Sequence, residues 1–444
     1  ASKDQLKQLS AVKGLVVDPL GKIVELPTKS NYREGLSIFE YVTSTRGSRK
    51  GLTDSALKTA DAGYLTRRLI DVAHDAIIRR EDCGTEKGLK LNRTDKRQAT
   101  LELRVMGRVA ASDIHVSKQK KVLIKKGDLI TEEKLPLLKD VESIFVRSPL
   151  TCELKYGICA QCYGMDLSSK KYVELGTPVG ILAAQSIGEP GTQLTMRVRH
   201  AGGIVGLDVT QGLPRVEELF EARTPKVSSP LAEISGKVTV EDSDEGYQIT
   251  IKSVGIKPVE LRTYTVLKAS ELKVKSGDLI SAGEALTTGS LDIKQVLQVR
   301  DLLETQNYLL SEVQKVYESQ GIPIHDKHFE VIIRKMSDKV RLETSGDTIL
   351  LPGEMVDKSV FEEENARILA SGGEPATAQV IILGITRASL YTESWLSSAS
   401  FQETTSVLTD AALGGKVDRL LGLKENVIIG RLIPVSADRA KIGD

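Results

Sequence analysis

The order of apolar and polar residues along the chain predicts one long helix and several groups of short strands. From Leu52 to about Arg80, residues that favour helices follow one another without a proline, so a single helix is expected there. Such a helix would be about 40 Å long, which is enough to cross a cleft. Residues 101–150 and 226–290 alternate over short stretches between turns, as strands do, and residues 292–320 return to a helical pattern.

A further helix is expected between two glycine-rich breaks. Residues 188–191 (Gly-Glu-Pro-Gly) interrupt the chain, and the glycines at 202, 203 and 206 loosen it again. One face of this helix would carry an amide, a thioether, a guanidinium and an imidazole: Gln193, Met196, Arg197 and His200. These groups suit the sugar, base and phosphates of a nucleoside triphosphate, although they also fit the solvated face of an ordinary helix.

The chain contains four cysteines, three of which are closely spaced. Cys152, Cys159 and Cys162 form a C-x6-C-x2-C motif, and Cys83 lies far upstream. Four thiolates that include one tight C-x-x-C suit tetrahedral zinc, which accepts a ligand from a distant segment. Four sulfur ligands leave no open position for water, so the predicted zinc site is structural. Disulfides and buried free thiols are the alternatives, and a cytosolic chain of this size disfavours disulfides.

Smaller motifs favour turns over metal sites. Lys125–Ile130 and Lys275–Ile280 share the pattern K-x-G-D-L-I, in which a Gly-Asp turn leads into an apolar pair. Two copies indicate two strand-rich modules with similar hairpins rather than a solenoid. Residues 242–244 (Asp-Ser-Asp) are expected in a solvated hairpin turn. His325 and His328 are expected at the surface entry of a strand rather than on a metal.

Composition narrows the class of protein. A chain of 444 residues is long enough for several domains, and 27% charged residues against 4% aromatic ones imply a large, wet surface. The net charge of +1 does not indicate a uniformly basic nucleic-acid-binding protein, although residues 1–100 carry an excess of Lys and Arg. There is no run of about twenty apolar residues, so no membrane span is expected. There is no signal-peptide pattern, and the charged start at Ala1 suggests part of a longer polypeptide.

Several strings resemble the β′ subunit family of bacterial RNA polymerase. Gln185–His200 (QSIGEPGTQLTMRVRH) resembles its trigger loop, and Arg49–Arg68 (RKGLTDSALKTADAGYLTRR) resembles its bridge helix. Glu81–Thr85 and Gly157–Gly164 are similar to the two parts of its second zinc site. Segments near the C-terminus, from Gly384 onward, resemble its clamp base and switch segments. The family usually has Thr-Phe where this chain has Val198-Arg199, so the base-packing end of the helix differs here and carries an extra cation.

The resemblance implies an α+β multidomain fold. Its parts would be a long bridge helix, a zinc-bound ribbon with four cysteine ligands, a mobile helical hairpin, strand-rich jaw and hairpin modules and a helical C-terminal clamp base. The expected boundaries are a loop region under the bridge helix (1–38), the bridge helix (39–80), a zinc-binding and strand-rich region (81–177), the trigger-loop hairpin (178–225), a jaw-like strand module with its following helix (226–320) and the clamp base and switch region (321–444).

The resemblance also implies part of the catalytic subunit of DNA-directed RNA polymerase, which synthesises RNA from NTPs on a DNA template. Gln193 would touch the ribose, Met196 would pack on the base, and Arg197 and His200 would meet the phosphates. The residues expected beside the template base are Thr59, Ala60, Tyr64 and Arg67. Arg67 and Arg68 could both reach phosphates.

One expected part of such an enzyme is absent from the sequence. The family binds catalytic Mg²⁺ through the string N-A-D-F-D-G-D, which does not occur here, so the Mg²⁺ ligands would lie on another segment. The implied partners are the N-terminal β′ segment, the β subunit, the α subunit dimer, the ω subunit, a sigma factor, DNA, RNA and NTPs, in the bacterial cytoplasm at the nucleoid. The alternatives are a zinc-stabilised structural or nucleic-acid-binding module without a direct catalytic role, and a self-sufficient enzyme, which the missing carboxylates oppose.

Overall fold

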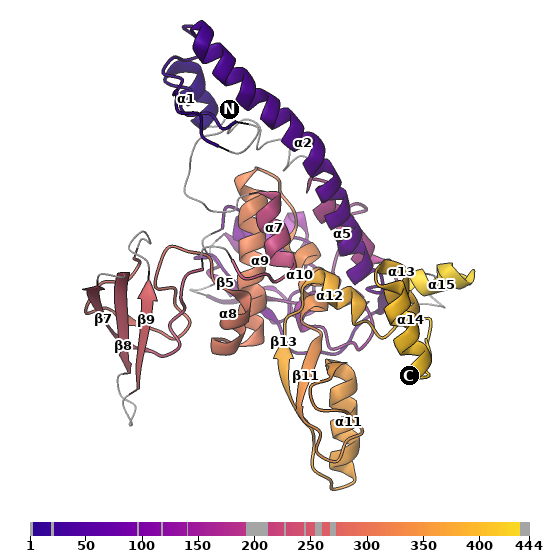
Figure 1. The fold of residues 1–444 in the computed structure, drawn as a ribbon. Coiled ribbons are helices and arrows are strands. Elements are labelled where there is room, and N and C mark those ends of the chain that lie inside the picture. Colours follow the sequence, from indigo (N-terminus) through magenta and orange to yellow (C-terminus); the bar gives the residue numbers. More distant parts are fainter. Residues whose placement is uncertain are drawn as a thin grey trace.

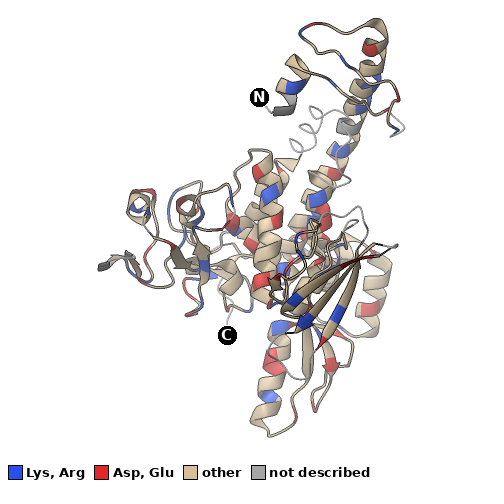
Figure 2. Cartoon of the chain, turned by 90° about the vertical axis from the view of Figure 1, so that its left-hand side faces the viewer, with Lys and Arg blue, Asp and Glu red and all other residues tan. Residues whose placement is uncertain are grey.

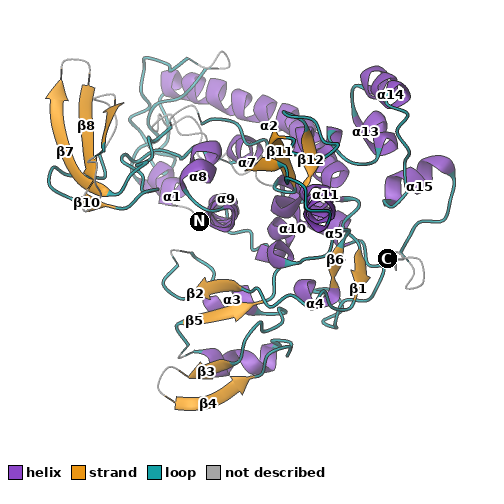
Figure 3. Cartoon of the chain, turned by 90° about the horizontal axis from the view of Figure 1, so that it is seen from below, coloured by secondary structure: helices purple, strands orange, loops and turns teal. Residues whose placement is uncertain are grey.

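The computed structural model describes residues 3–18, 22–95, 97–116, 119–139, 141–191, 212–225, 228–243, 246–253, 260–266 and 272–435. Its most prominent element is α2 (Ile38–Ala73), a long helix that projects from the body of the molecule (Figure 1). The N-terminal helix α1 (Lys3–Ser10) lies near the outer end of α2, and the other helices surround its inner end (Figure 1). The strands form small separate sheets around this helical centre (Figure 3).

α2 begins and ends earlier than the sequence pattern predicts. Ser37 caps its N-terminus, because the Ser37 hydroxyl accepts the Glu40 N–H at 3.4 Å and the Glu40 carboxylate accepts the Ser37 N–H at 2.9 Å. The helix stops at Ala73, and Ile78–Arg80 form strand β1 instead of further helical turns. β1 pairs in parallel with β6 (Ile158–Cys159), so a tertiary contact overrides the helical propensity of these residues.

The main hydrophobic core forms around the inner half of α2, and six other described helices contribute to it. Leu65, Leu69 and Val72 of α2 are buried in it, at the spacing of one helical face. The other described helices in the core are α5 (Val179–Gly188), α7 (Leu213–Phe220), α8 (Ile293–Val299), α9 (Leu302–Ser319), α10 (Asp326–Met336) and α12 (Ile385–Leu390).

Two glycines bring α5 into backbone contact with α2. A Cβ atom at Gly180 would lie 1.8 Å from the carbonyl oxygen of Ala73, and one at Gly188 would lie 2.3 Å from the Thr66 hydroxyl oxygen. No larger residue fits at either position without moving a helix. α5 is therefore held along the inner half of α2 at a fixed, very short separation.

α10 lies at the centre of the core, so the expected surface strand at His325 and His328 was wrong. His325 caps this helix, with its ring nitrogen accepting the Lys327 N–H at 3.2 Å, and nearly all of α10 is buried. Glu330 of α10 forms a two-pronged ion pair with the buried Arg108 at 2.9 and 2.5 Å. The charged residues of this segment suggested a solvent-exposed position, because charged side chains are rarely buried unless they are paired. Their partners are distant in sequence, so a local pattern does not reveal the pairing.

In the part of the chain that the structure describes, the short strands form five small sheets. The parallel pair β1–β6 and the antiparallel pairs β2–β5 and β3–β4 lie in the cysteine-containing region, and the other two sheets have the orders β10-β7-β8-β9 and β12-β11-β13. Their bounds are β2 Leu89–Asn92, β3 Ile114–Val116, β4 Gln119–Ile124, β5 Ser143–Val146, β7 Gly236–Ser243, β8 Gly246–Ser253, β9 Leu261–Val266, β10 Leu279–Ile280, β11 Lys339–Thr344, β12 Met355–Asp357 and β13 Thr377–Ile381.

The two K-x-G-D-L-I segments adopt the same turn. The backbone N–H of Asp128 donates to the Lys125 carbonyl oxygen, and that of Asp278 to the Lys275 carbonyl oxygen, both at 3.2 Å. The preceding glycines have positive φ angles, 88° at Gly127 and 102° at Gly277. Each turn pairs with a strand distant in sequence rather than closing a local hairpin. Ala110 donates to the Asp128 carbonyl at 3.0 Å, and Val238 donates to the Asp278 carbonyl at 2.9 Å. The repeat is confirmed as a structural one, but the expected local hairpins were wrong.

Helices and short turns complete the described structure. The helical pattern at 292–320 is split into α8 (Ile293–Val299) and α9, because Arg300 is extended and its guanidinium donates to the Gly283 carbonyl at 2.5 Å. The region after residue 320 contains the β12-β11-β13 sheet as well as the expected helices. Among the described residues, no helix is both long and apolar enough to cross a membrane. The remaining helices are α3 (Leu101–Val105), α4 (Ala160–Tyr163), α11 (Lys358–Ala370), α13 (Trp395–Phe401), α14 (Thr404–Leu413), α15 (Leu423–Ile429) and the 3-10 helices η1 (Glu132–Leu138) and η2 (Pro149–Thr151).

Candidate functional site

Four cysteine side chains come together from three segments of the chain. Cys83 follows β1, and Cys152 caps the C-terminal end of η2. Cys159 caps the N-terminus of the single-turn helix α4, and Cys162 lies within that helix. Their sulfur atoms all lie within 4.8 Å of one another, and the Cys83 and Cys162 sulfurs are 3.7 Å apart. A disulfide needs about 2.05 Å, whereas sulfurs around one tetrahedral zinc ion lie roughly 3.8 Å apart. All four are free thiols, and their arrangement can hold a metal ion.

Local backbone geometry explains how the sequence brings these cysteines together. The parallel pairing of β1 with β6 places Cys83 beside the C-x-x-C turn. Gly157 has a φ of 73°, and a Cβ atom there would lie 2.3 Å from the Ile77 carbonyl oxygen. The Cys162 N–H donates to the Cys159 sulfur at 3.3 Å, so the backbone itself holds that sulfur in place.

A buried arginine lies against the sulfur atoms. Arg147 donates to the sulfurs of Cys83 at 3.3 Å and Cys162 at 3.4 Å, and to the Asp82 carboxylate at 2.6 Å. Burial alone would lower the pKa of Arg147, but its hydrogen bond to Cys162 raises that pKa above its usual range. The guanidinium therefore offsets negative charge on the sulfurs. The sequence analysis missed Arg147, because no spacing rule links it to the cysteines.

Hydrogen bonds among the sulfurs make two of the thiols more acidic than usual. Hydrogen bonding with Cys152 holds the pKa of Cys83 well below its usual range, and hydrogen bonding with Cys159 lowers the pKa of Cys152 to about 6. Thiolates, rather than thiols, bind metals. Hydrogen bonding with Cys152 raises the pKa of Cys159 and that of Cys162, so two of the four sulfurs ionise more readily than the other two.

One side of α2 displays the residues that the sequence analysis assigned to nucleic acid. Thr59, Ala60, Tyr64 and Arg67 are all exposed and lie away from the buried face of the helix. Tyr64 is 41% exposed, and the Arg67 side chain is 60% exposed and lies 3.7 Å from the Asp71 carboxylate. The structure therefore brings these four residues together on one accessible surface.

An open groove with a cationic rim begins beside this surface. Tyr64 lines it, as do Gln379, Val380 and Ile381 of β13. Its exposed or half-exposed basic side chains are Arg223, Lys294, Arg300, Arg341 and Arg387, and its acidic ones are Glu217, Glu221 and Asp301. Elsewhere Lys and Arg alternate with Asp and Glu over the molecule (Figure 2), so this rim is a local excess of positive charge in a nearly neutral chain.

Arg68 lies next to Arg67 but points into the protein. Its side chain is 3% exposed and forms ion pairs with Glu217 of α7, at 3.2 Å, and with Glu221, which caps the end of α7. The expectation that both arginines reach phosphates was therefore wrong for Arg68. Two carboxylates from another helix occupy its guanidinium, which no local sequence pattern could indicate.

The segment that carries Gln193, Met196, Arg197 and His200 lies outside the described residues. Its two flanks, however, are described. Gly191 follows α5, and a Cβ atom there would lie 3.5 Å from the Ala62 side chain of α2. Leu213, at the start of α7, is buried in the same core cluster as Ala62. Both flanks therefore belong to the core that covers the buried side of α2.

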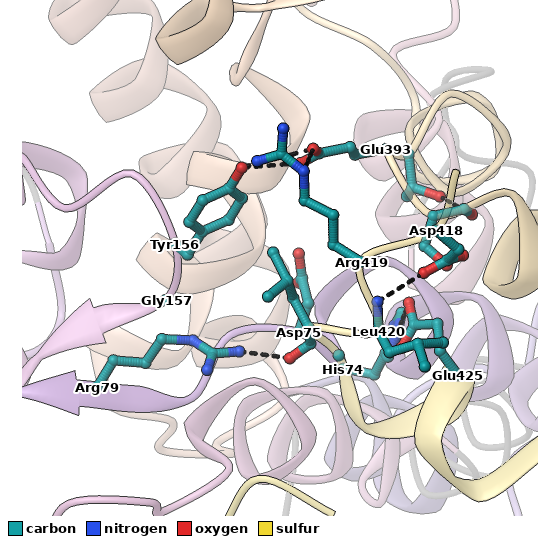
Figure 4. Close-up of a pocket in the computed structure, with 14 residues that line it drawn as sticks. His74, Asp75, Arg79, Tyr156, Gly157, Glu393, Asp418, Arg419, Leu420 and Glu425 are labelled. Carbon is teal, nitrogen blue, oxygen red and sulfur yellow. Dashed lines mark hydrogen bonds and ion pairs between the residues drawn. The ribbon is translucent and has the colours of Figure 1, made fainter. Parts of the chain in front are cut away.

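A small pocket lies where α2 ends (Figure 4). His74, the residue after α2, is buried and lies 3.4 Å from the Glu425 carboxylate of α15. Arg79 donates to the Leu421 carbonyl at 2.6 Å, and Tyr156, from the cysteine loop, donates to Glu393 at 3.1 Å. These groups join the end of α2 to the cysteine region and to the C-terminal helices. The sequence analysis missed this joint, because its partners lie more than 200 residues apart along the chain.

Comparison with known proteins supplies the family. The model of the family described as RNA polymerase Rpb1, domain 5, matches residues 35–393. The chain belongs to this family. The chain is 54% identical over 445 residues to the DNA-directed RNA polymerase subunit beta′ of Caldicellulosiruptor saccharolyticus. It is 51% identical over 438 residues to the subunits of that name from Caldanaerobacter subterraneus subsp. tengcongensis and a type A strain of Clostridium botulinum.

The match covers nearly all of this Rpb1 domain 5 chain but only a part of each relative. The first alignment includes 99% of the chain and 38% of the relative, and the other two include 98% and 37%. The chain thus spans less than two-fifths of the length of these beta′ subunits. The resemblance that the sequence motifs indicated is confirmed at the level of the family.

Proposed function

We propose that this chain is a section of the β′ subunit of a multisubunit DNA-directed RNA polymerase, in which it positions the NTP and the template and takes part in translocation. One observation carries the proposal. The segment that holds Gln193 to His200 is flanked by Gly191, which packs against Ala62 of α2, and by Leu213, which joins the same core cluster, and α2 exposes Tyr64 and Arg67 on its other side. A nucleotide bound between them would contact a rigid helix on one side and a segment able to close over it on the other.

The mechanism proposed for these residues is closure over a correctly paired substrate. The incoming NTP pairs with the template beside Thr59, Ala60 and Tyr64. Gln193 then meets the ribose, Met196 packs on the base, and Arg197 and His200 meet the phosphates. Because closure is favourable only around a paired base, it couples selection of the nucleotide to alignment of the reacting groups. We assign His200 to electrostatic stabilisation, since Arg197 would lie one turn away in the expected helix and the work is neutralisation of phosphate charge.

The cationic groove beside Tyr64 is proposed as part of the nucleic-acid path. Phosphate contacts by Lys and Arg supply most of the sequence-independent affinity of proteins for DNA. The rim residues Arg223, Lys294 and Arg387 line the same groove as Tyr64 and would meet the phosphates of a nucleic acid bound along it. A nearly neutral chain can bind nucleic acid in this way, because its positive charge is concentrated in one place.

Metal and partner assignments belong to the same proposal. Cys83, Cys152, Cys159 and Cys162 would hold one structural zinc ion, because four sulfur donors leave no position for substrate. Mg²⁺ for nucleotidyl transfer would be bound by another segment of the subunit. The proposed partners are the N-terminal β′ segment, the β, α and ω subunits, a sigma factor, DNA, RNA and NTPs, in the bacterial cytoplasm at the nucleoid.

Reconstitution of the polymerase tests this function. The chain alone should incorporate no nucleotide, whereas the complex with the other segments should extend RNA, and Arg197→Ala should slow it by about a hundredfold. RNA synthesis by the isolated chain would contradict the proposal. Extension by a complex that lacks this chain would favour the alternative, a zinc-stabilised module without a direct catalytic role.

A second variant separates the two roles of the imidazole. His200→Gln keeps a hydrogen-bond donor but cannot ionise, so under electrostatic stabilisation it should slow elongation less than Arg197→Ala does. An effect as large as that of Arg197→Ala, together with loss of the pH dependence between about 6 and 8, would identify His200 as a general acid instead.

A further inference from the structure

A cavity lies where three segments that are far apart in sequence meet. Most of its lining residues come from α3 and the residues before it, from residues 165–170, and from the end of α9 with the turn into α10. Its volume is about 540 Å³, within the range of about 300–1,000 Å³ that is typical of sites for small organic molecules. Among the described residues, none lines both this cavity and the groove beside Tyr64.

The wall of this cavity is mostly apolar. The side chains that make it so are Leu103, Met106, Met165, Leu167, Ile322 and Ile324. Two of the five methionines of the chain are among them, and an unbranched thioether adapts to molecules of different shape. Leu103 is 54% exposed, so the wall reaches the surface of the protein at α3. An apolar molecule bound here would lose much of its contact with water, which favours binding.

The main charged groups of the lining already have partners of opposite charge. Arg104 pairs with Asp326 at 3.3 Å and with Asp95 at 2.9 Å. Lys170 pairs with Glu132 at 3.1 Å. A charged molecule would compete with these ion pairs, whereas a neutral molecule leaves them intact. The lining therefore favours a neutral occupant.

Two oxygen atoms of the lining residues accept no hydrogen bond. Gln314 is 2% exposed, and its amide nitrogen donates to the Ile324 carbonyl at 2.6 Å and to the Asp326 carboxylate at 2.7 Å. The Oε1 atom of Gln314 has no hydrogen-bond partner among the described residues. The same holds for Oε1 of Glu318, which lies 3.6 Å from the Arg97 guanidinium, too far for a hydrogen bond. A buried acceptor without a donor is unfavourable, so a donor on a bound molecule would be stabilised here.

We propose that this cavity binds a neutral, largely apolar small molecule that carries a hydrogen-bond donor. The apolar body would fill the space between α3 and the turn from α9 to α10, and the donor would pair with the free oxygen of Gln314 or Glu318. This site goes beyond the proposed function, because it involves neither nucleotide nor template. One molecule would contact all three segments, so its binding would also hold them together.

The test uses N-phenyl-1-naphthylamine, a neutral aromatic fluorophore with one N–H, whose emission rises in an apolar site. It is titrated into the assembled polymerase that contains this chain within the complete β′ subunit, and we expect saturable binding. Leu103→Trp adds a ring to the wall from an exposed position, so it should weaken this binding at least about tenfold. Gln98→Trp, at a second exposed position of the lining, should act in the same way and decides if Leu103→Trp does not assemble.

The matched control is Leu369→Trp. Leu369 lies on α11 outside the cavity and is 59% exposed, close to the exposure of Leu103, so this variant should bind the fluorophore as the wild type does. Binding that the variants of the lining leave unchanged, or the absence of saturable binding to the wild-type complex, would overturn the site.

A second compound tests the hydrogen bond. N-methyl-N-phenyl-1-naphthylamine has the same rings but no N–H, so it should bind about tenfold more weakly than the first compound. Equal affinities of the two compounds would overturn the assigned class of ligand. The assay requires no RNA synthesis, so its failure would leave the proposed function intact, and a complex inactive in RNA synthesis would still report on the cavity.

Discussion

Glycine at position 180 is required by distance rather than by backbone conformation. Alanine there would gain up to about 1 kcal/mol in helix propensity. Its Cβ would, however, lie 1.8 Å from the Ala73 carbonyl oxygen, a backbone atom that cannot move without shifting α2. Overpacking of this kind costs about 1–3 kcal/mol or more, so the clash outweighs the propensity. We therefore expect Gly180→Ala to lower the free energy of unfolding by about 2 kcal/mol in urea denaturation.

The control for this prediction is a glycine inside α2. A Cβ at Gly51 would meet nothing within 4 Å, so Gly51→Ala should leave stability unchanged or raise it by up to about 1 kcal/mol. Equal effects at the two positions would show that α5 and α2 are not in backbone contact.

His74 makes the end of α2 sensitive to pH. Burial alone would lower the pKa of His74, but its hydrogen bond with Glu425 raises it above the ordinary 6.5. Burial would raise the pKa of Glu425, but the hydrogen bond from His74 lowers it below the ordinary 4.5. The contribution of His74 to the free energy of unfolding is lost as the pH rises through its raised pKa. The contribution of Glu425 is lost as the pH falls through its lowered pKa. The pair should stabilise the chain most between about pH 4.5 and 6.5.

The corresponding measurement compares His74→Asn with the wild type by thermal unfolding at several pH values. The variant should be less stable by about 2 kcal/mol near pH 6, and the difference should shrink as the pH rises through the raised pKa of His74. His115→Asn, at an exposed strand residue, is the control and should show no such trend. A difference that stays constant over this pH range would contradict an ionised His74–Glu425 pair.

At the scale of elements, the four-cysteine cluster depends on Arg147, the residue that follows β5, as well as on its four cysteines. Removing Arg147 would leave the negative charge of the sulfurs without its nearest cation. We expect Arg147→Gln to lower the affinity for zinc about tenfold, measured by competition with a chromogenic chelator. Lys170→Gln, in an exposed ion pair with Glu132 of the same region, should bind zinc as the wild type does. Cys152→Ser should bind far less zinc than either, and zinc binding unaffected by Cys152→Ser would exclude the four-sulfur site.

The elements also show what a linear sequence can predict. The four cysteines were identified from spacing, because metal ligation imposes a chemical signature that any fold must satisfy. The residues on the exposed face of α2 were named from the resemblance to the β′ family, and periodicity alone did not single them out. α10 and the end of α2 were not predicted, because they depend on partners distant in sequence: Arg108 neutralises Glu330, and β6 converts residues 78–80 from helix to strand. Such pairings override local propensity and leave no local trace.

At the scale of the whole molecule, the outer end of α2 exposes large apolar side chains. The consecutive residues Ile38 and Phe39 are 82% and 81% exposed, and Tyr41, two residues after Phe39, is 65% exposed. Apolar groups gathered at a projecting tip mark contact surfaces for other polypeptides. Since the chain corresponds to 38% of its relative, we expect this tip to be covered in the assembled subunit.

Replacing both tip residues tests that expectation. Ile38→Ser with Phe39→Ser should improve the solubility of the chain alone and weaken its co-purification with the rest of β′ by about tenfold, since two large anchors are lost. Leu351→Ser, which removes a comparably exposed apolar residue far from this tip, is the control (68% exposed). Unchanged assembly of the double variant would show that the tip is solvent-exposed in the complex.

The separation of Cys83 from the other cysteines along the chain has a consequence for loop entropy. A metal ion held by Cys83 and Cys152 acts as a cross-link that closes a loop of about 70 residues, which removes about 4 kcal/mol of entropy from the unfolded chain. This gain depends only logarithmically on loop length, and doubling the loop changes it by about 0.6 kcal/mol. The strands between these cysteines could therefore be lengthened, or replaced by an inserted domain, while the metal centre continues to stabilise the inner end of α2.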